Sequence, residues 1–155
     1  MGQFLSITTS STEDLGSAAL DELRSMLEYS FGEAYDQAAW ENCLGGMHFF
    51  IRHREKLIGH ASVIPRFIAI GGTEFRAGYM ESAAMLPEYR GRLYGTAVVA
   101  AASAYTLDEF DLGALATGST AFYERTRWKA WTGRSFVVRD GVVTAASPHG
   151  KVMVL

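Results

Sequence analysis

The sequence predicts a mixed α+β fold in one domain that spans residues 1–155. Apolar residues recur every three or four positions in some segments and every second position in others, which is typical of helices that alternate with strands. Hydrophobic residues make up 48% of the chain and charged residues 20%, an ordinary globular composition. A chain of this length buries about 70% of its unfolded surface on folding. No repeat or linker divides it, so we expect a single core.

The first part of the chain is expected to form one strand and two helices. Residues 4–9 alternate like a strand, and the polar run 10–14 offers N-cap oxygens and early acidic residues to a helix. The buried stripe of that helix is formed by Leu20, Leu23, Met26, Leu27 and Phe31. A shorter helix is predicted from Asp36 to Cys43, and the glycine pair 45–46 ends it.

Three antiparallel strands are predicted in the middle of the chain. Residues 48–54 and 56–70 are rich in Ile, Phe and Val and flank a charged turn, so they read as a hairpin. The glycine pair 71–72 then turns the chain into a third strand at 73–86. These segments predict a meander that forms the centre of a sheet.

The last part of the chain is expected to alternate between helices and strands. A helix is predicted at 95–110 from its alanine content, and a short buried strand at 112–116. The polar run 117–120 is expected to begin another helix. From residue 129 onward the pattern indicates strands, and residues 151–155 are expected to close the sheet.

Charge and cysteine content exclude several classes of protein. A net charge of −3 gives no general attraction to nucleic acid or to an anionic membrane, because both need a basic face. No apolar run approaches the ~20 residues that a membrane-spanning helix needs. Cys43 is the single cysteine, so no intrachain disulfide can form. We therefore expect a cytoplasmic protein that acts on small molecules.

The histidines, the cysteine and the tryptophans give no sign of a metal site or of a thiol nucleophile. The histidines are scattered along the sequence at His48, His53, His60 and His149. His48 and His53 would point to opposite faces of one strand, so no metal is expected. Cys43 has no histidine near it in sequence and is interpreted as a small core residue. The core is also the expected place of Trp40, Trp128 and Trp131.

Residues 78–96, GYMESAAMLPEYRGRLYGT, say the most about function. A strand that carries Glu81 runs through Pro87 into a basic, glycine-containing turn, and this turn opens an alanine-rich helix. Backbone N–H groups at a helix start are unpaired and carry partial positive charge, so phosphate binds there. Glycine lets the phosphate approach the backbone closely. The segment therefore predicts a pyrophosphate-binding turn.

Several short motifs together resemble a known family, the Gcn5-related N-acetyltransferases, and within it the aminoglycoside 2'-N-acetyltransferases. The motifs are Leu44-Gly45-Gly46-Met47-His48, His60-Ala61 with Val63-Ile64, Gly78-Tyr79 with Glu81, Arg90-Gly91, Leu112-Gly113-Ala114-Leu115, and Tyr123 with Trp128 and Trp131. They occur in order and with nearly matching spacing from about residue 31 to residue 155. As a set they are specific, although each alone is weak.

The resemblance implies a central, mostly antiparallel twisted sheet whose fourth and fifth strands splay apart, with acetyl-CoA in the gap as the cosubstrate. The pantetheine arm would pair with the backbone of Ala83, Ala84 and Met85 like an added strand. The pyrophosphate would bind the turn formed by Arg90, Gly91, Arg92, Leu93, Tyr94, Gly95 and Thr96. Leu93 stands where the family commonly has glycine, and Gly95 is kept.

Acetyl transfer from a thioester to an amine requires a base, a donor for the oxygen that becomes negative and a proton for the departing thiolate. Glu81 is the candidate base, and burial would have to raise its pKa from an ordinary value near 4.3. Tyr123 is the candidate acid, since a phenol with a pKa of roughly 10 is close to balance with a thiol. The acceptor is expected to contact Asp36, Glu81, Ser82 and Thr117.

The acceptor is predicted to be an aminoglycoside-type antibiotic acetylated on its 2'-amine, which would give resistance. Two features leave alternatives open. Ala34 and Ala39 stand where the family has acidic residues, and His149 stands where an acid is common. The chain also stops at Leu155, before the tail that helps to shape the family's acceptor site, so the pocket is expected to be more open or completed by a second subunit of a homodimer. The alternatives are another amine, such as an aminosugar, a polyamine or a peptide N-terminus, and a non-catalytic acyl-CoA or drug-binding module.

Overall fold

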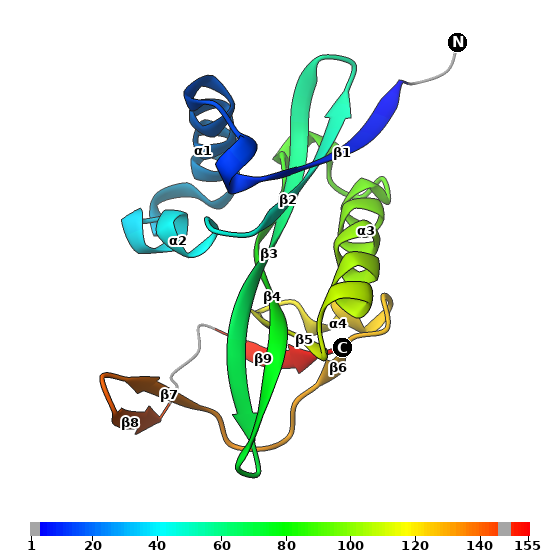
Figure 1. Ribbon diagram of the computed structural model, residues 1–155. Coiled ribbons are helices and arrows are strands. Elements are labelled where there is room, and N and C mark those ends of the chain that lie inside the picture. Colours follow the sequence, from blue (N-terminus) through cyan, green and yellow to red (C-terminus); the bar gives the residue numbers. More distant parts are fainter. Residues whose placement is uncertain (1–3, 146–149) are drawn as a thin grey trace.

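The computed structural model of the protein describes residues 4–145 and 150–155, and its central feature is a seven-stranded sheet (Figure 1). The strand order is β1-β2-β3-β4-β5-β9-β6, and β7 pairs with β8 in a separate two-stranded sheet. The strands are β1 (Leu5–Ser11), β2 (Met47–His53), β3 (Lys56–Ile70), β4 (Thr73–Met85), β5 (Leu112–Thr117), β6 (Lys129–Ala130), β7 (Phe136–Arg139), β8 (Val142–Ala145) and β9 (Lys151–Val154). The four α-helices are α1 (Ser17–Phe31), α2 (Gln37–Asn42), α3 (Tyr94–Glu109) and α4 (Thr120–Glu124). Short 3-10 turns are η1 (Thr12–Asp14), η2 (Gly32–Ala34) and η3 (Pro87–Tyr89).

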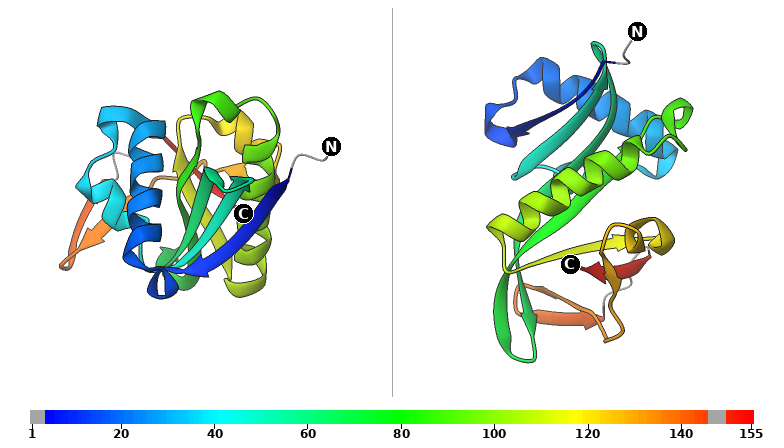
Figure 2. Two further views of the ribbon diagram at one scale, coloured as in Figure 1. Left: turned by 90° about the horizontal axis from the view of Figure 1, so that it is seen from above. Right: turned by 90° about the vertical axis from the view of Figure 1, so that its right-hand side faces the viewer.

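The sheet is covered by helices on both faces, which buries its middle strands. Figures 1 and 2 show α1 and α2 on one face and α3 on the other. Leu23 and Leu27 of α1 are fully buried, as are Ile58 and Val63 of β3. Helix α3 lies close to β4 because Gly78 has no side chain, and a Cβ there would come within 2.8 Å of the Phe110 ring. The predicted α+β class and the helix-flanked, mostly antiparallel sheet are confirmed.

The predicted elements are present, with two corrections at the first helix. Phe31 of its predicted buried stripe is exposed at the end of α1. The polar run at 10–14 does not begin α1, which starts after Gly16. Ser11 caps the separate turn η1 instead, with its Oγ accepting from the N–H of Asp14 at 3.2 Å. At the other end of the chain β9 closes the sheet by inserting between β5 and β6, and β7 and β8 stay apart from it. The prediction for His149 lies outside the described residues.

Candidate active site

The only parallel pair in the described part of the sheet, β4 with β5, separates after three residue pairs. The ladder joins Ala77 to Leu112, Gly78 to Gly113 and Tyr79 to Ala114. Beyond Tyr79, β5 pairs with β9, and β4 continues along β3 alone. The predicted splay of the fourth and fifth strands is therefore confirmed. It leaves an open edge on β4 from Met80 to Met85.

A cleft of about 350 Å³ lies between the separated strands. It is lined by Phe31, Ala34, Tyr35, Ala39, Met80, Glu81, Ser82, Ala83, Leu115, Ala116, Thr117, Gly118 and Tyr123. The structure thus brings together four of the predicted catalytic and acceptor residues: Glu81, Ser82, Thr117 and Tyr123. A second groove of about 390 Å³ lies between α1 and η3 and contains none of the predicted site residues.

A β-bulge shapes the β4 side of the cleft. Ser62 of β3 pairs with Glu81, and His60 pairs with Ala84, so β4 holds one residue more than β3 between these pairs. Ser82 takes up the difference with a φ of 48°, which a non-glycine residue adopts at a strain of about 1–3 kcal/mol. Its hydroxyl lies 2.9 Å from the Tyr35 hydroxyl. Its carbonyl lies 2.9 Å from Nδ1 of His60. Strain of this kind is concentrated at functional sites.

Glu81 is partly buried in the cleft, and burial raises the pKa of its carboxyl. The guanidinium of Arg66 opposes this shift, with its Nη2 at 2.9 Å from Glu81 Oε1. Arg66 also stacks on Tyr79, at 4.2 Å from the ring centre. Sequence reasoning missed Arg66. The signal was the hairpin register, because the turn at 71–72 places Arg66, Tyr79 and Glu81 on the same face of the sheet.

Tyr123 of α4 lines the other side of the cleft and is almost fully buried. Its ring packs edge-on against Phe122 and Trp128, at centroid distances of 5.0 and 6.3 Å. Burial raises the pKa of Tyr123 to about 12. The expectation of an ordinary phenol in balance with a thiol was therefore wrong, because the apolar surroundings disfavour the phenolate.

The predicted phosphate turn runs from η3 into α3. Gly91 has a φ of 74° and Leu93 a φ of 63°, so two positive-φ residues bend the chain just before the helix. The Arg90 guanidinium donates to the carbonyls of Met85 at 3.1 Å and Ser30 at 3.0 Å. Arg90 therefore ties the turn to the ends of β4 and α1. The guanidinium of Arg92 lies 5.9 Å from the Tyr89 ring centre.

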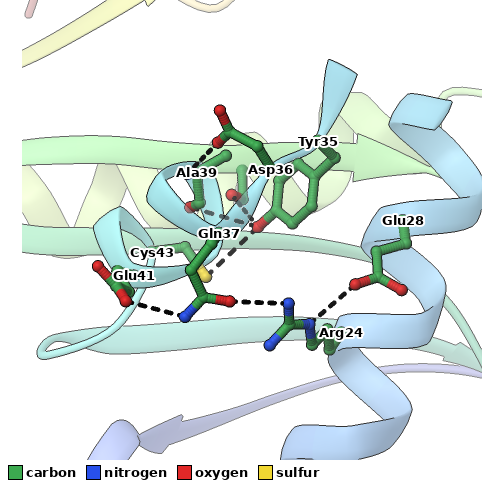
Figure 3. A network of polar contacts seen from close by, with 9 residues as sticks. Arg24, Glu28, Tyr35, Asp36, Gln37, Ala39, Glu41 and Cys43 are labelled. Carbon is green, nitrogen blue, oxygen red and sulfur yellow. Dashed lines mark hydrogen bonds and ion pairs between the residues drawn. The ribbon is translucent and has the colours of Figure 1, made fainter. Parts of the chain in front are cut away.

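The predicted acceptor residue Asp36 does not line the cleft. Its carboxylate caps α2 and accepts from the N–H of Ala39 at 2.9 Å (Figure 3). The neighbouring Tyr35 does line the cleft, and its ring stacks on Phe31 at 5.2 Å. The two rings form an aromatic wall that sequence reasoning missed. Figure 3 shows the Tyr35 hydroxyl directed toward Cys43, which is fully buried as predicted.

Two histidines that sequence reasoning treated as scattered are in contact. His48 of β2 and His60 of β3 are fully buried, and Nδ1 of His48 lies 2.9 Å from Nε2 of His60.

Trp128 is buried as expected, whereas Trp131 is exposed, so its placement in the core was wrong. Among residues 4–145 and 150–155, no three His, Cys, Asp or Glu side chains are grouped to hold a metal ion. No helix within these ranges is long and apolar enough to span a membrane.

Comparison with known proteins agrees with this fold. The acetyltransferase (GNAT) domain family matches residues 12–130. An aminoglycoside 2'-N-acetyltransferase of Mycolicibacterium fortuitum is 36% identical over 135 residues, which cover 86% of this chain and 69% of that protein. The chain therefore belongs to the GNAT family. The predicted enzyme class, an acetyl-CoA-dependent N-acetyltransferase, is confirmed.

Solved structures share the fold at low identity. Escherichia coli ElaA superposes with a TM-score of 0.71 at 12% identity and covers 97% of this chain and 99% of its own. Eis1 of Mycobacterium abscessus gives a TM-score of 0.69 at 16% identity over 86% of this chain, and this chain spans 33% of Eis1. A probable N-acyltransferase of Enterococcus faecalis gives 0.66 at 19% identity over 82% of this chain and 33% of its own. Each is evidence of the GNAT fold alone.

Proposed function

We propose that the protein transfers the acetyl group of acetyl-CoA to the 2'-amine of an aminoglycoside-type antibiotic and so gives resistance to it. The observation that carries this proposal is the cleft between β4 and β5, which places Glu81 and Tyr123 beside the open edge of one strand. The M. fortuitum relative supports the choice of acceptor by its name.

The chain offers a fitting site for acetyl-CoA, which supplies the acetyl group as an activated thioester. Ala83 and Ala84 lie on the open edge of β4, where an extended arm can add as a strand. Gly91 and the start of α3 offer backbone N–H groups to the pyrophosphate. Gly95 keeps the helix close to β4, because a Cβ there would lie 3.3 Å from Met85 Cγ. The Met85 carbonyl accepts from Arg90 and keeps a second lone pair, so the pairing would extend over Ala83, Ala84 and Met85.

Three groups of the chain would carry the chemistry. Glu81 takes a proton from the acceptor amine as its nitrogen bonds to the acetyl carbon. The Ala83 N–H stabilises the negative charge that develops on the acyl oxygen. Tyr123 gives its proton to the sulfur as the carbon–sulfur bond breaks. The phenol of Tyr123 is protonated at neutral pH, and the apolar surroundings that raise its pKa also disfavour a charged thiolate, so the departing sulfur would take the proton.

The direction of the Ala83 N–H follows from peptide geometry. A trans peptide holds its C=O and N–H antiparallel. The Ser82 carbonyl points toward His60 on β3. The N–H of the same peptide, on Ala83, therefore points away from the His60 ring, and we propose that it faces the gap left where β5 has separated from β4.

A second candidate acceptor is a smaller amine of lower charge. Arg66 already neutralises Glu81, and the Asp36 carboxylate is used as a helix cap. A polyamine sugar binds best where several free carboxylates converge, and the cleft lining has Glu81 as its one carboxylate among the described residues.

We further propose, from the family resemblance, that the protein is a cytoplasmic homodimer. Sedimentation equilibrium tests the dimer.

Release of free thiol from acetyl-CoA tests the proposal. The assay compares aminoglycoside pairs that differ only in a 2'-amine or a 2'-hydroxyl, and it includes aminosugars and polyamines. We expect thiol release with the 2'-amine member alone. Release with both members, or with polyamines only, would move the function to the second candidate. No release with any amine would remove both.

A further inference from the structure

A continuous chain of hydrogen bonds runs from Thr12 of η1, through two buried histidines, to the bulge in β4. The Gly45 N–H donates to Oγ1 of Thr12 at 2.9 Å, and this oxygen lies 2.6 Å from Nε2 of His48. His48 Nδ1 lies 2.9 Å from His60 Nε2, and His60 Nδ1 lies 2.9 Å from the Ser82 carbonyl. The chain thus ends on the strained residue of the active-site cleft.

The carbonyl at one end and the neutral state of both buried rings together fix the direction of every bond. A carbonyl only accepts, so His60 Nδ1 carries a hydrogen and its Nε2 accepts from His48 Nδ1. His48 Nε2 then accepts from the Thr12 hydroxyl. Each ring has one N–H and one bare nitrogen, which is the neutral form. Burial agrees with this assignment, because it lowers the pKa of His48 to about 4 and that of His60 to about 3.

The far end of the chain is held firmly. The Gly46 backbone lies directly on β3, since a Cβ at this residue would overlap the Val63 carbonyl. The Thr12 N–H donates to the Gly46 carbonyl at 3.0 Å. These contacts anchor Thr12, and through it His48 and His60. The anchoring explains the Gly45-Gly46-Met47-His48 motif, which the catalytic residues alone leave without a role.

We infer that His60, supported by His48, is a positioning residue that holds the Ser82–Ala83 peptide with the Ala83 N–H aimed into the gap. This inference rests on the proposed function, in which that N–H binds the acyl oxygen. Ser82 has a φ of 48°, and a strained peptide of this kind persists only when its surroundings hold it. The His60 hydrogen bond to its carbonyl supplies that hold.

The test compares two replacements of His60. His60→Leu removes the donor, and His60→Asn retains a side-chain N–H at nearly the place of Nδ1. We expect His60→Leu to lower kcat about 100-fold, as loss of one oxyanion donor does. The KM for acetyl-CoA and the affinity for CoA, which has no acyl oxygen, should stay unchanged. His60→Asn should restore most of kcat.

A spectroscopic readout separates positioning from a merely structural role. The carbonyl stretch of acetyl-CoA labelled with ¹³C at the acetyl carbon reports the hydrogen bond to its oxygen. It should shift to lower frequency on the wild-type protein and return toward its solution value on His60→Leu. Ser103→Ala serves as the matched control, because it removes another buried hydrogen bond, to Trp128 Nε1 at 2.9 Å, far from Ser82 in the chain.

The outcomes separate this inference from the proposed function. An active wild type whose kcat and carbonyl frequency survive His60→Leu would overturn the positioning role. A wild type that releases no thiol with any amine would overturn the proposed function, while its carbonyl frequency would still decide the role of His60. Absence of acetyl-CoA binding would overturn both. If the His60→Leu variant does not fold, His48→Leu removes the hydrogen bond between His48 and His60 instead. The carbonyl stretch of bound acetyl-CoA should then move in the same direction, by a smaller amount.

Discussion

The two edges of β4 differ in how completely they are paired. On the β3 side the ladder runs from Thr73 to Met85, interrupted by the bulge. On the β5 side it stops after Tyr79. The buried histidines of β2 and β3 lie on the side of the closed edge, and the cleft lies along the open edge. In β4, the complete pairing of one edge holds the strand in place, and the other edge is left free to present its backbone and side chains to ligands.

The largest expected effect is on the open edge. Glu81→Gln keeps the size of the side chain but removes the base, so kcat should fall about 10²–10⁴-fold. Steady-state thiol release measures it. Glu74→Gln, at the far exposed end of the same strand, is the matched control and should keep wild-type kcat. Equal activity of the two variants would remove Glu81 from the mechanism.

The two buried histidines beside the closed edge should make the free energy of unfolding depend on pH. His48 and His60 have folded-state pKa values of about 4 and about 3, below their ordinary value of 6.5. The unfolded chain therefore binds more protons between about pH 6.5 and 4, and stability falls as the pH falls through that window. Each histidine should contribute a slope of about 1.4 kcal/mol per pH unit. Urea unfolding at several pH values measures it, and His60→Leu should flatten the curve.

Loss of the proposed acid should have a smaller effect. Tyr123→Phe removes one hydroxyl from a packed ring, so the fold should persist and kcat should fall about 10–100-fold. A thioester with a better leaving group needs less help from an acid, so the fall in kcat caused by Tyr123→Phe should be smaller with such an acetyl donor. A loss that is the same for every donor would assign Tyr123 to packing alone.

The smallest expected effect concerns Arg66, which lies on β3 and pairs with Glu81 of β4. Its guanidinium lowers the pKa of Glu81 against the effect of burial. Arg66→Gln should therefore raise that pKa, and the acidic limb of the kcat/KM profile should move up by about one pH unit. The base is needed ionised, so activity is lost first at low pH. A limb that moves down would show that Arg66 acts other than by its charge.

Local patterns in the sequence predicted the elements and the general position of the site. The alternation in β3 and β4, the alanine-rich run of α3 and the glycine turn before it are all encoded by neighbouring residues. Glu81 reaches the cleft because it lies on β4 just past the point where β5 separates. Charge and periodicity were sufficient for the elements and the glycine turn, whereas the separation of β4 and β5 beside Glu81 was implied by the family resemblance.

Contacts between distant segments were beyond sequence reasoning. The bulge at Ser82 shifts the register of β4 by one residue, and only that shift brings its carbonyl to His60. Tyr35 reaches Ser82 from the loop before α2. The Arg66–Glu81 pair is different, because the register of the predicted hairpin was enough to find it. The raised pKa of Tyr123 depends on packing against Phe122 and Trp128, which periodicity does not describe.

Hydrogen–deuterium exchange with and without CoA tests the central claim most directly, because it reads the backbone of both edges of β4 at once. We expect new protection at residues 83–85 and 91–96, with little change at β1 and β2. Protection at the groove between α1 and η3 instead, or no protection at the open edge of β4, would contradict it.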